Sequence, residues 1–254
     1  MSKIISSQKA LPLVPKEPSL ILPTLVFSDA ALSAIKWLAL VLMVLDHFNK
    51  YILGGAFTWM YDLGRISMPL FAFVLGYNLA RPGMLASGGY RRVALRLACF
   101  GLIATVPFVI LNKLLGGWWP LNMMLSLLVV TVSAWLFEKG HGRAVILGCL
   151  VLVWGGALGE YWWPGIGLSL CVWSYYRKPD VGWIFGFIAC LTLLYLVNGN
   201  LWAFGTLPVL LGLRYWSILL PRIRWFFYAF YPIHLFAFWI YLAMTNGTLQ
   251  GLTV

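Results

Sequence analysis

The fold of this chain is decided by an apolar run near its start. Residues 31–53 read ALSAIKWLALVLMVLDHFNKYIL, close to the ~20 apolar residues that a helix needs to cross a ~30 Å hydrocarbon core. Ser28 and Asp29 stand immediately before this run, where a side-chain oxygen accepts from the free N–H groups of a first helical turn. We therefore predict a membrane helix that begins at these two residues.

The whole chain has the composition of a membrane protein. Of its 254 residues, 62% are hydrophobic and only 10% are charged, far below the roughly 25% of a soluble domain. Further apolar runs lie at 63–79, 94–111, 120–137, 144–158, 162–176, 181–197, 201–213 and 225–244. We predict an all-α, polytopic membrane helix bundle with about nine transmembrane helices. The runs at 144–158, 162–176 and 201–213 are short and contain Gly or Pro, so each is compatible with a tilted or half-inserted segment.

Lysine and arginine alternate between rich and poor loops along the chain. With the N-terminus placed inside, the inner segments contain most of them: Lys3, Lys9, Lys16, Arg81, Arg91, Arg92, Arg96, Lys139, Arg143, Arg177, Lys178, Arg214, Arg222 and Arg224. The outer segments contain only Lys50, Arg65 and Lys113. This pattern predicts an N-in, C-out topology in the bacterial inner membrane. The net charge of +11 thus follows the loops, and no nucleic-acid partner is expected.

The chain divides into a short tail and one membrane domain. Residues 1–28 contain four prolines and scattered lysines, and are expected to form a cytoplasmic N-terminal tail. Residues 29–254 are expected to form a single transmembrane domain without internal repeats. The four cysteines lie inside apolar runs without CxxC spacing, so neither a disulfide framework nor a metal site is predicted.

Three polar residues gather near the outer ends of the first two predicted helices. Asp46 and His47 lie about 25 Å along the first helix at 1.5 Å per residue, and Arg65 opens the second helix from the same side. Ionisable side chains in a bilayer are costly and mark candidate functional sites. We expect Asp46 to pair with Arg65 and His47 to face a cavity. A structural group of Asp46, Lys50 and Arg65, with His47 packed beside it, is compatible with the same spacing.

His234 follows Pro232 about halfway through the last predicted helix. Because Pro232 lacks an N–H, it frees a carbonyl one turn earlier and kinks the helix, which can open room for a ligand. A structural histidine bonded to the freed carbonyl fits the same pattern. Inner arginines are candidates to bind the phosphates of a nucleotide-bearing cofactor: Arg91, Arg92, Arg96, Arg222 and Arg224. Topogenic charge and contact with anionic lipid explain each of them as well.

Three segments carry a family resemblance: IKWLALVLMVLDH at 35–47, LGRISMPLFAFVLGYNLAR at 63–81 and FYAFYPIHL at 227–235. Together they resemble the TraX family of conjugative pilin acetylases. The resemblance is dense over residues 33–81 and 225–240, whereas the intervening runs match only in hydropathy and aromatic content. It places four residues of this chain at motif positions: Asp46, His47, Arg65 and His234.

The resemblance implies an acetyltransferase of pilus biogenesis, distantly like other transmembrane acyltransferases. Acetyl-CoA would be the co-substrate and the N-terminal amine of membrane-inserted pilin the acceptor, with pilus-assembly proteins as further candidate partners. On this hypothesis His47 takes the proton of the amine, and Asp46 or Arg65 fixes its geometry. His234 or Arg65 donates to the oxyanion, and the inner arginines hold the phosphates of the donor.

Other functions are compatible with the same residues. Acyl transfer to a glycan or lipid, or another reaction that matures pilin, would use the same chemistry on a different acceptor. A non-catalytic membrane scaffold for pilus assembly would use the polar residues as structural contacts. A proton-coupled transporter is less compatible, because the chain has only seven acidic residues, most of them in loops.

Overall fold

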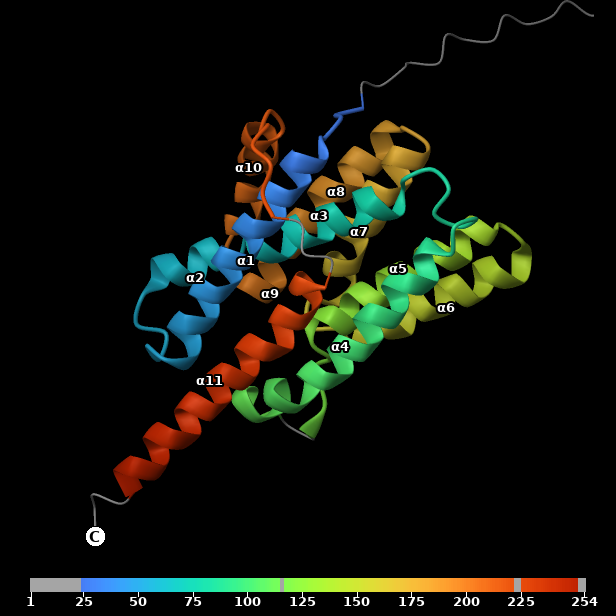
Figure 1. Ribbon diagram of the computed structural model, residues 1–254. Helices are drawn as coiled ribbons and strands as arrows, with labels where there is room; N and C mark the ends of the chain where they lie inside the picture. The colour runs from blue at the N-terminus through green and yellow to red at the C-terminus, as the bar shows by residue number, and fades with distance from the viewer. Residues whose placement is uncertain (1–23, 115–116, 222–224, 251–254) are drawn as a thin grey trace, which may run out of the picture.

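The structure is a computed structural model that describes residues 24–114, 117–221 and 225–250, and all its regular elements are helical (Figure 1). They are α1 (Asp29–Tyr51), α2 (Thr58–Gly64), α3 (Ser67–Leu79), α4 (Gly89–Asn112), α5 (Met123–Lys139), α6 (Gly142–Leu158), α7 (Trp162–Arg177), α8 (Val181–Leu193), α9 (Tyr195–Asn198), the 3-10 helix η2 (Trp202–Gly205), α10 (Thr206–Leu213) and α11 (Phe226–Gln250). The all-α prediction is confirmed for these residues. The predicted tail falls almost entirely outside them.

Four helical stretches in the described ranges are long and apolar enough to cross a bilayer. They are Asp29–Tyr51, Gly89–Asn112, Val181–Asn198 and Phe226–Thr245. Gly142–Leu158 and Trp202–Leu213 are apolar but shorter. The membrane-compatible character of the chain is therefore confirmed, while the expected number of nine spans stays a prediction.

The first helix begins where the sequence predicts. The Ser28 hydroxyl accepts a hydrogen bond from the Ala31 N–H at 3.0 Å, which caps α1. The predicted run 63–79, by contrast, is interrupted between α2 and α3. Pro69 explains this break, because it has no N–H to donate to the carbonyl of Arg65, four residues earlier.

The helices bring the chain's basic loops to one end of the bundle, here called the basic end. Arg81, after α3, pairs with Asp29 at the start of α1, with 2.6 Å between nitrogen and oxygen. Arg177, at the end of α7, pairs with Glu138 near the end of α5 at 2.8 Å. These contacts join four helix termini, so pairs of charged side chains connect neighbouring helices at this end.

The opposite end, here called the site end, is joined by polar contacts between loops. Lys50, in the last turn of α1, donates to the Asn112 side chain at the end of α4 at 2.6 Å. The Tyr61 hydroxyl in α2 donates to the Asn198 carbonyl at the end of α9 at 2.8 Å. Both contacts lie beside the polar residues of the first two helices, so the candidate site sits at this end.

Helix α3 packs closely between α1 and α7. The Ser67 hydroxyl donates to the Ala39 carbonyl at 2.7 Å, and the Ser169 hydroxyl to the Ala72 carbonyl at 2.8 Å. At Gly76, an added Cβ would lie 2.4 Å from the Ser169 carbonyl oxygen, so only glycine permits this approach of α3 to α7. Small residues and hydroxyl-to-carbonyl bonds of this kind are typical of packed membrane helices.

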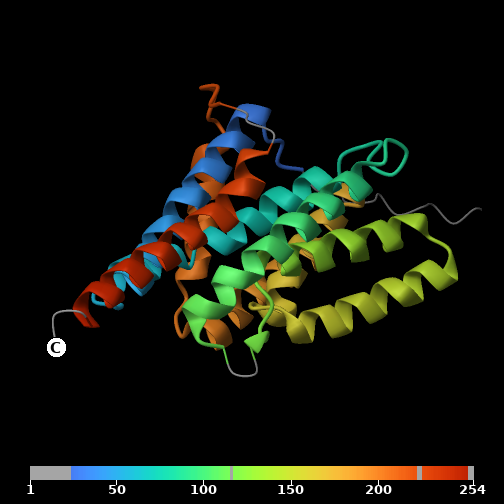
Figure 2. The same ribbon diagram turned by 60° about the horizontal axis from the view of Figure 1, so that its bottom comes forward.

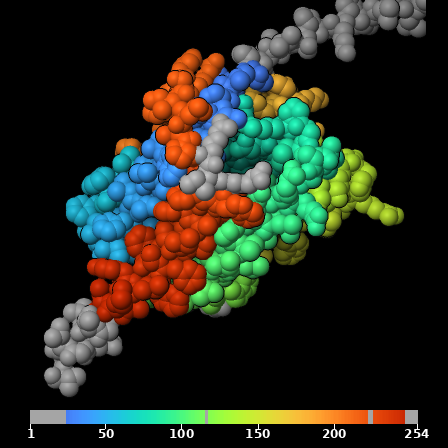
Figure 3. All heavy atoms as spheres, viewed as in Figure 1, coloured from blue at the N-terminus to red at the C-terminus, as the bar shows by residue number. Residues whose placement is uncertain are grey.

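The first and last helices run side by side in the same direction (Figures 1 and 2). Near their starts, the rings of Trp37 and Phe226 have centroids 5.1 Å apart, and near the end of α1 the rings of Tyr51 and Phe238 are 5.8 Å apart. Figure 3 shows α11 lying along α4 on its other flank. This parallel contact brings residues from the two ends of the chain together.

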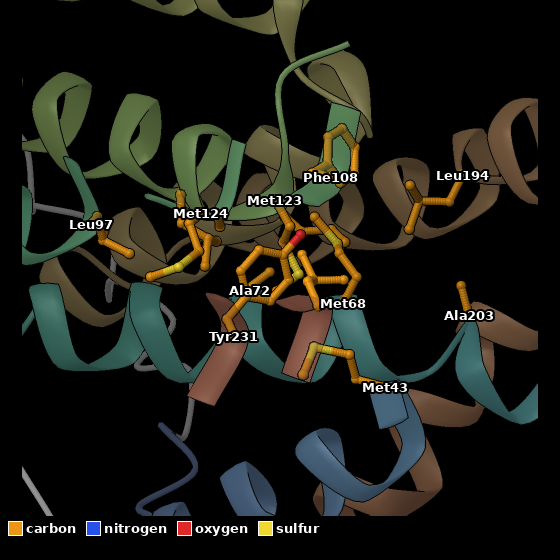
Figure 4. Packing of buried hydrophobic residues seen from close by; sticks show 14 of the residues in the cluster. Met43, Met68, Ala72, Leu97, Phe108, Met123, Met124, Leu194, Ala203 and Tyr231 are labelled. Atoms are coloured by element: carbon orange, nitrogen blue, oxygen red, sulfur yellow. The ribbon is translucent and has the colours of Figure 1, made fainter. Parts of the chain in front are cut away.

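A hydrophobic cluster rich in methionine fills the bundle beneath the site end. Met43, Met68 and Met123 come from α1, α3 and α5, and are each under 10% exposed. Tyr231 of α11 points into this cluster beside Met68 and Met123 (Figure 4). Because methionine is unbranched and repacks easily, this part of the core can adjust its shape.

Candidate functional site

The candidate site is a polar cavity of about 510 Å³ at the site end. This volume falls within the ~300–1,000 Å³ of small-molecule sites. Charged or titratable side chains from α1, from the junction of α2 and α3, and from the turn between α6 and α7 line it: Asp46, His47, Lys50, Arg65, Glu160 and Tyr161. A second cavity of about 20 Å³, roughly one water molecule, continues from His47 toward Met43 and Met68.

The loop between α1 and α2 forms part of the cavity wall and is held by one buried side chain. Asn49 donates from its amide to the Phe57 carbonyl at 2.9 Å and accepts from the Phe57 N–H at 3.0 Å. Gly54 and Gly55 have φ values of +63° and +79°, which glycine adopts without strain. The loop thus folds back over α1 and leaves the cavity open between them.

His47 and His234 form a hydrogen-bonded pair at the back of the cavity. The Nδ1 atom of His47 lies 2.7 Å from the Nε2 atom of His234. The ring planes differ by only 5°, with centroids 5.0 Å apart. Because 2.7 Å is well below the ~3.5 Å contact distance of stacked carbon atoms, the rings meet edge to edge. Pairing between these two predicted residues was not expected from the sequence.

The hydrogen bonds of this pair determine its tautomers. The Nδ1 atom of His234 lies 3.0 Å from the Phe230 carbonyl oxygen, which can only accept, so His234 carries its proton on Nδ1. Its Nε2 atom must then accept from Nδ1–H of His47. The remaining Nε2 atom of His47 is left with a lone pair, so the neutral pair presents a base. The carbonyl freed by Pro232 is that of Tyr228, four residues earlier. The structure instead pairs His234 with the carbonyl of Phe230.

Asp46 and Arg65 form the ion pair that the sequence predicts. Both side chains are only 12–13% exposed. Arg65 also donates from Nε to the Tyr61 carbonyl at 3.2 Å and lies over the Tyr61 ring at 4.1 Å from its centroid. An added Cβ on Gly64 would meet the Asp46 Cβ at 2.4 Å, so this glycine permits α2 to approach α1 at the ion pair.

The contacts of Lys50 distinguish between the two arrangements compatible with the sequence. Lys50 donates to Asn112 rather than to Asp46, while Asp46 binds Arg65 and His47 lines the cavity. The geometry therefore agrees with the arrangement in which Asp46 pairs with Arg65 and His47 faces a cavity. The chemical roles of these residues stay predictions.

Sequence reasoning missed Glu160, which lies in the turn between α6 and α7 and borders both cavities. Burial raises the pKa of its carboxyl group from 4.5 to about 7, against the opposing effects of Lys50 and Arg65. The available signal was an acidic residue in an outer loop of a chain that has only seven. Its carboxylate adds a second acid–base group beside His47.

The structure places the three candidate arginines of α4 far from the cavity. Arg91 and Arg92 are exposed at the start of α4, about 30 Å from its end at Asn112, at 1.5 Å per residue. Arg96 lies over the Trp225 ring at 4.6 Å from its centroid. Arg222 and Arg224 lie outside the described residues. No group of three or more metal-ligating side chains occurs in the ranges that the structure covers.

Comparison with known proteins gives a family model and curated relatives that carry the same name. The family model described as TraX protein matches residues 31–242. A relative named Protein TraX from Escherichia coli is 31% identical over 169 residues, covering 66% of this chain and 65% of the relative. Protein TraX of Escherichia coli strain K12 is 30% identical over 170 residues, with the same coverage. The match thus spans somewhat less than two thirds of these relatives' own length. No solved structure matches the chain.

The matched residues include the elements that build the cavity. The family model extends from the start of α1 to near the end of α11, and so contains Asp46, His47, Arg65, Glu160 and His234. Since it covers well over half of the chain, the chain belongs to the TraX protein family.

Proposed function

We propose that this protein is a membrane-embedded acetyltransferase that moves an acetyl group from acetyl-CoA to the N-terminal amine of conjugative pilin. The observation that supports this most strongly is the fixed tautomer of the histidine pair. It leaves the His47 Nε2 lone pair as the available base on a residue that lines a 510 Å³ cavity. Acyl transfer to an amine requires a base of this kind.

The proposed topology places the cavity on the outer side of the inner membrane, in an N-in, C-out bundle of about nine spans. Two features support it. Among the residues that the structure describes, most lysines and arginines lie at the basic end, as on the cytoplasmic faces of membrane proteins. The site end carries exposed tryptophans, as in the aromatic belt at a membrane interface. Among them Trp118, Trp119, Trp162 and Trp163 are each at least 38% exposed. An inserted pilin could present its new N-terminus at this end.

The reaction balances with one proton passing through His47. The neutral amine attacks the thioester carbonyl carbon, and His47 Nε2 takes a proton from the amine nitrogen as the C–N bond forms. When the C–S bond breaks, the departing thiolate receives this proton. His234 and the Phe230 carbonyl hold His47 in the required tautomer throughout. The products are the N-acetyl chain and the free thiol.

Arg65 is the proposed donor to the oxyanion. Its Nη2 and Nε atoms bind Asp46 and the Tyr61 carbonyl, which fixes the plane of the guanidinium group at the cavity wall. Its Nη1 atom is left to face the developing charge. Both ring nitrogens of His234 are already engaged, so His234 is better suited to position His47. A well-placed donor contributes about 2.7–4 kcal/mol.

The acyl donor would bind from the basic end. Arg91, Arg92 and Arg96, together with Arg222 and Arg224, are the proposed ligands of its phosphates. The thioester would then reach His47 through the bundle, along the methionine-rich cluster beneath the cavity. The small second cavity between His47, Met43 and Met68 supports this route, because methionine side chains repack readily.

The function is tested by co-expressing the protein with its pilin and recording the intact mass of extracted pilin. A mass gain of one acetyl group at the pilin N-terminus is expected with the wild type and is lost with His47→Ala. The matched control is His141→Asn, which replaces a histidine that caps α6 outside the cavity with another good capping residue. No mass gain, despite confirmed insertion of both proteins, would reject acetyl transfer to pilin.

A further inference from the structure

One charged group that faces the cavity has no partner. Asp46 and Arg65 pair with each other, and Lys50 donates to Asn112. The carboxylate of Glu160, in contrast, makes no hydrogen bond or ion pair with any residue in the described ranges. Glu160 is half-buried and its carboxylate opens onto the cavity. A partly desolvated carboxylate without a partner is costly, so its presence at the candidate site needs an explanation.

The backbone holds Glu160 firmly in this position. The Leu121 N–H donates to the Leu158 carbonyl at 2.8 Å, and the Glu160 N–H donates to the Leu121 carbonyl at 3.0 Å. These bonds tie the turn between α6 and α7 to Leu121, two residues before α5. The neighbouring Tyr161 lines the same cavity. The carboxylate is therefore presented to the cavity by a fixed turn rather than by a mobile loop.

We propose that Glu160 binds the protonated amino group of the acceptor chain, so that the cavity selects a free amino terminus over a hydroxyl group. This inference rests on the proposed function and specifies its acceptor chemistry. A carboxylate and an ammonium group form short, charge-assisted hydrogen bonds. A glycan or lipid hydroxyl is uncharged and would leave Glu160 without a counter-ion.

The proposed contact between Glu160 and the ammonium group also explains where the amine loses the proton that it must give up before it attacks. An N-terminal ammonium group has an ordinary pKa of about 7.7–8.0, and burial raises the pKa of Glu160 to about 7. The two groups are close enough in pKa for Glu160 to accept one proton from the ammonium group and later release it to water. His47 then takes the second proton during attack. The net change is one proton released for each acetyl group transferred.

The test is a binding measurement on the full-length protein in nanodiscs without acetyl-CoA. The probes are the peptide amide Ala-Val-Leu-Leu with a free amino terminus and the same peptide with its terminus acetylated, each carrying a C-terminal fluorophore. We expect the wild type to bind the free amine about tenfold more tightly, equal to ~1.4 kcal/mol. Glu160→Gln should bind both peptides equally. Glu160→Asp, which keeps the charge on a shorter side chain, should retain part of the preference.

The control is Asp180→Asn, which removes a carboxylate at the start of α8, outside the cavity, and leaves its helix-capping oxygen in place. It should bind both peptides as the wild type does. Unchanged binding of the acetylated peptide by Glu160→Gln shows that the cavity is intact. A preference for the free amine that persists in Glu160→Gln, or no preference in the wild type, overturns the proposal. Because this readout needs no acetyl transfer, its result is independent of the pilin mass measurement.

Discussion

His47 and His234 are separated by 187 positions in the chain, and their imidazole nitrogens lie 2.7 Å apart. The pair therefore depends on the parallel packing of α1 and α11. It also relies on Phe230, whose carbonyl determines which nitrogen of each ring carries a proton. Each of these dependencies gives an expectation that mutagenesis can test.

Removing the partner of His47 should impair the reaction without weakening donor binding. In His234→Ala, kcat should fall, because His47 loses the acceptor that fixes its tautomer, while KM for acetyl-CoA should change little. The loss should be smaller than the ~10²–10⁴-fold expected for His47→Ala. His234→Gln offers an amide oxygen to His47 Nδ1–H and should recover part of kcat. Equal losses in the Ala and Gln variants would indicate a packing role alone.

The ion pair of Asp46 and Arg65 should show strong coupling in stability. Because both side chains are largely buried, Asp46→Asn or Arg65→Gln alone leaves an unpaired charge and should lower the free energy of unfolding by about 3–5 kcal/mol. The double variant leaves neither charge and should be less destabilised than the sum of the two. Thermal unfolding in detergent gives this double-mutant cycle, and additive effects would contradict the coupling.

Gly64→Ala should disturb the site through packing. Its new Cβ would meet the Asp46 Cβ at 2.4 Å, so either α2 or Asp46 must move. Overpacking of this kind costs about 1–3 kcal/mol, and we expect lower thermal stability together with lower transfer activity. Gly212→Ala is the matched control, because nothing lies within 4 Å of its new methyl group. It should stabilise α10 slightly, and a similar loss in both variants would refute the packing argument.

The preference for a free amine should depend on pH with two limbs. Below about pH 7 Glu160 becomes protonated, and above about pH 8 the amine loses its charge, so the preference should be greatest between these values. Burial raises the pKa of Glu160, so the ionised carboxylate is disfavoured in the empty cavity. A bound ammonium group compensates its charge and favours the ionised form. Other titratable groups around Glu160 come from α1, from α2 and its junction with α3, from its own turn and from α11: Asp46, His47, Lys50, Tyr51, Tyr61, Arg65, Tyr161 and Tyr231.

Peptide binding measured from pH 5.5 to 9 tests this profile, with buffers chosen around the ~7.7–8.0 pKa of the amine. Glu160→Gln should lose the acid limb. His47→Gln should keep it, which separates titration of Glu160 from titration of the imidazole. An acid limb that is absent from His47→Gln and present in Glu160→Gln would assign it to His47.

The arginines at the start of α4 should affect the acyl donor alone. Replacing Arg91 and Arg92 together by Gln should raise KM for acetyl-CoA several-fold, because each charge-assisted hydrogen bond contributes about 1.5–3 kcal/mol in favourable geometry and less when exposed. The pilin KM should stay unchanged. Arg143→Gln, at the start of α6, is a suitable control for loss of basic charge. An unchanged KM for acetyl-CoA would assign these arginines to topology or lipid contact.

Much of the helical pattern could be predicted from hydropathy, because lipid requires long apolar helices. The run 31–53 corresponds to α1 and the run 144–158 to α6 within a few residues. Breaks inside runs were harder to predict. Pro69 and Pro208 lie in the first turns of α3 and α10, and each lacks the N–H that would continue the preceding turn.

The site was predictable where it is local. Asp46 and Arg65 are joined by one short hairpin, so their spacing indicated an ion pair. The partner of His47 was not predictable, because one sequence does not reveal which distant helices pack together. Glu160 was missed for a related reason. Its adjacent residues suggest only an outer loop, and its place beside His47 depends on the bonds of that turn to Leu121.

The contact between the first and last helices also has a consequence for biosynthesis. α1 leaves the ribosome well before α11, so His47 is synthesised 187 residues ahead of its partner His234. Until α11 inserts, nothing holds the His47 ring in its basic tautomer. If the proposed function is correct, a chain that stalls before α11 lacks the partner that orients its base, so the histidine pair can act only after the last helix has packed against the first.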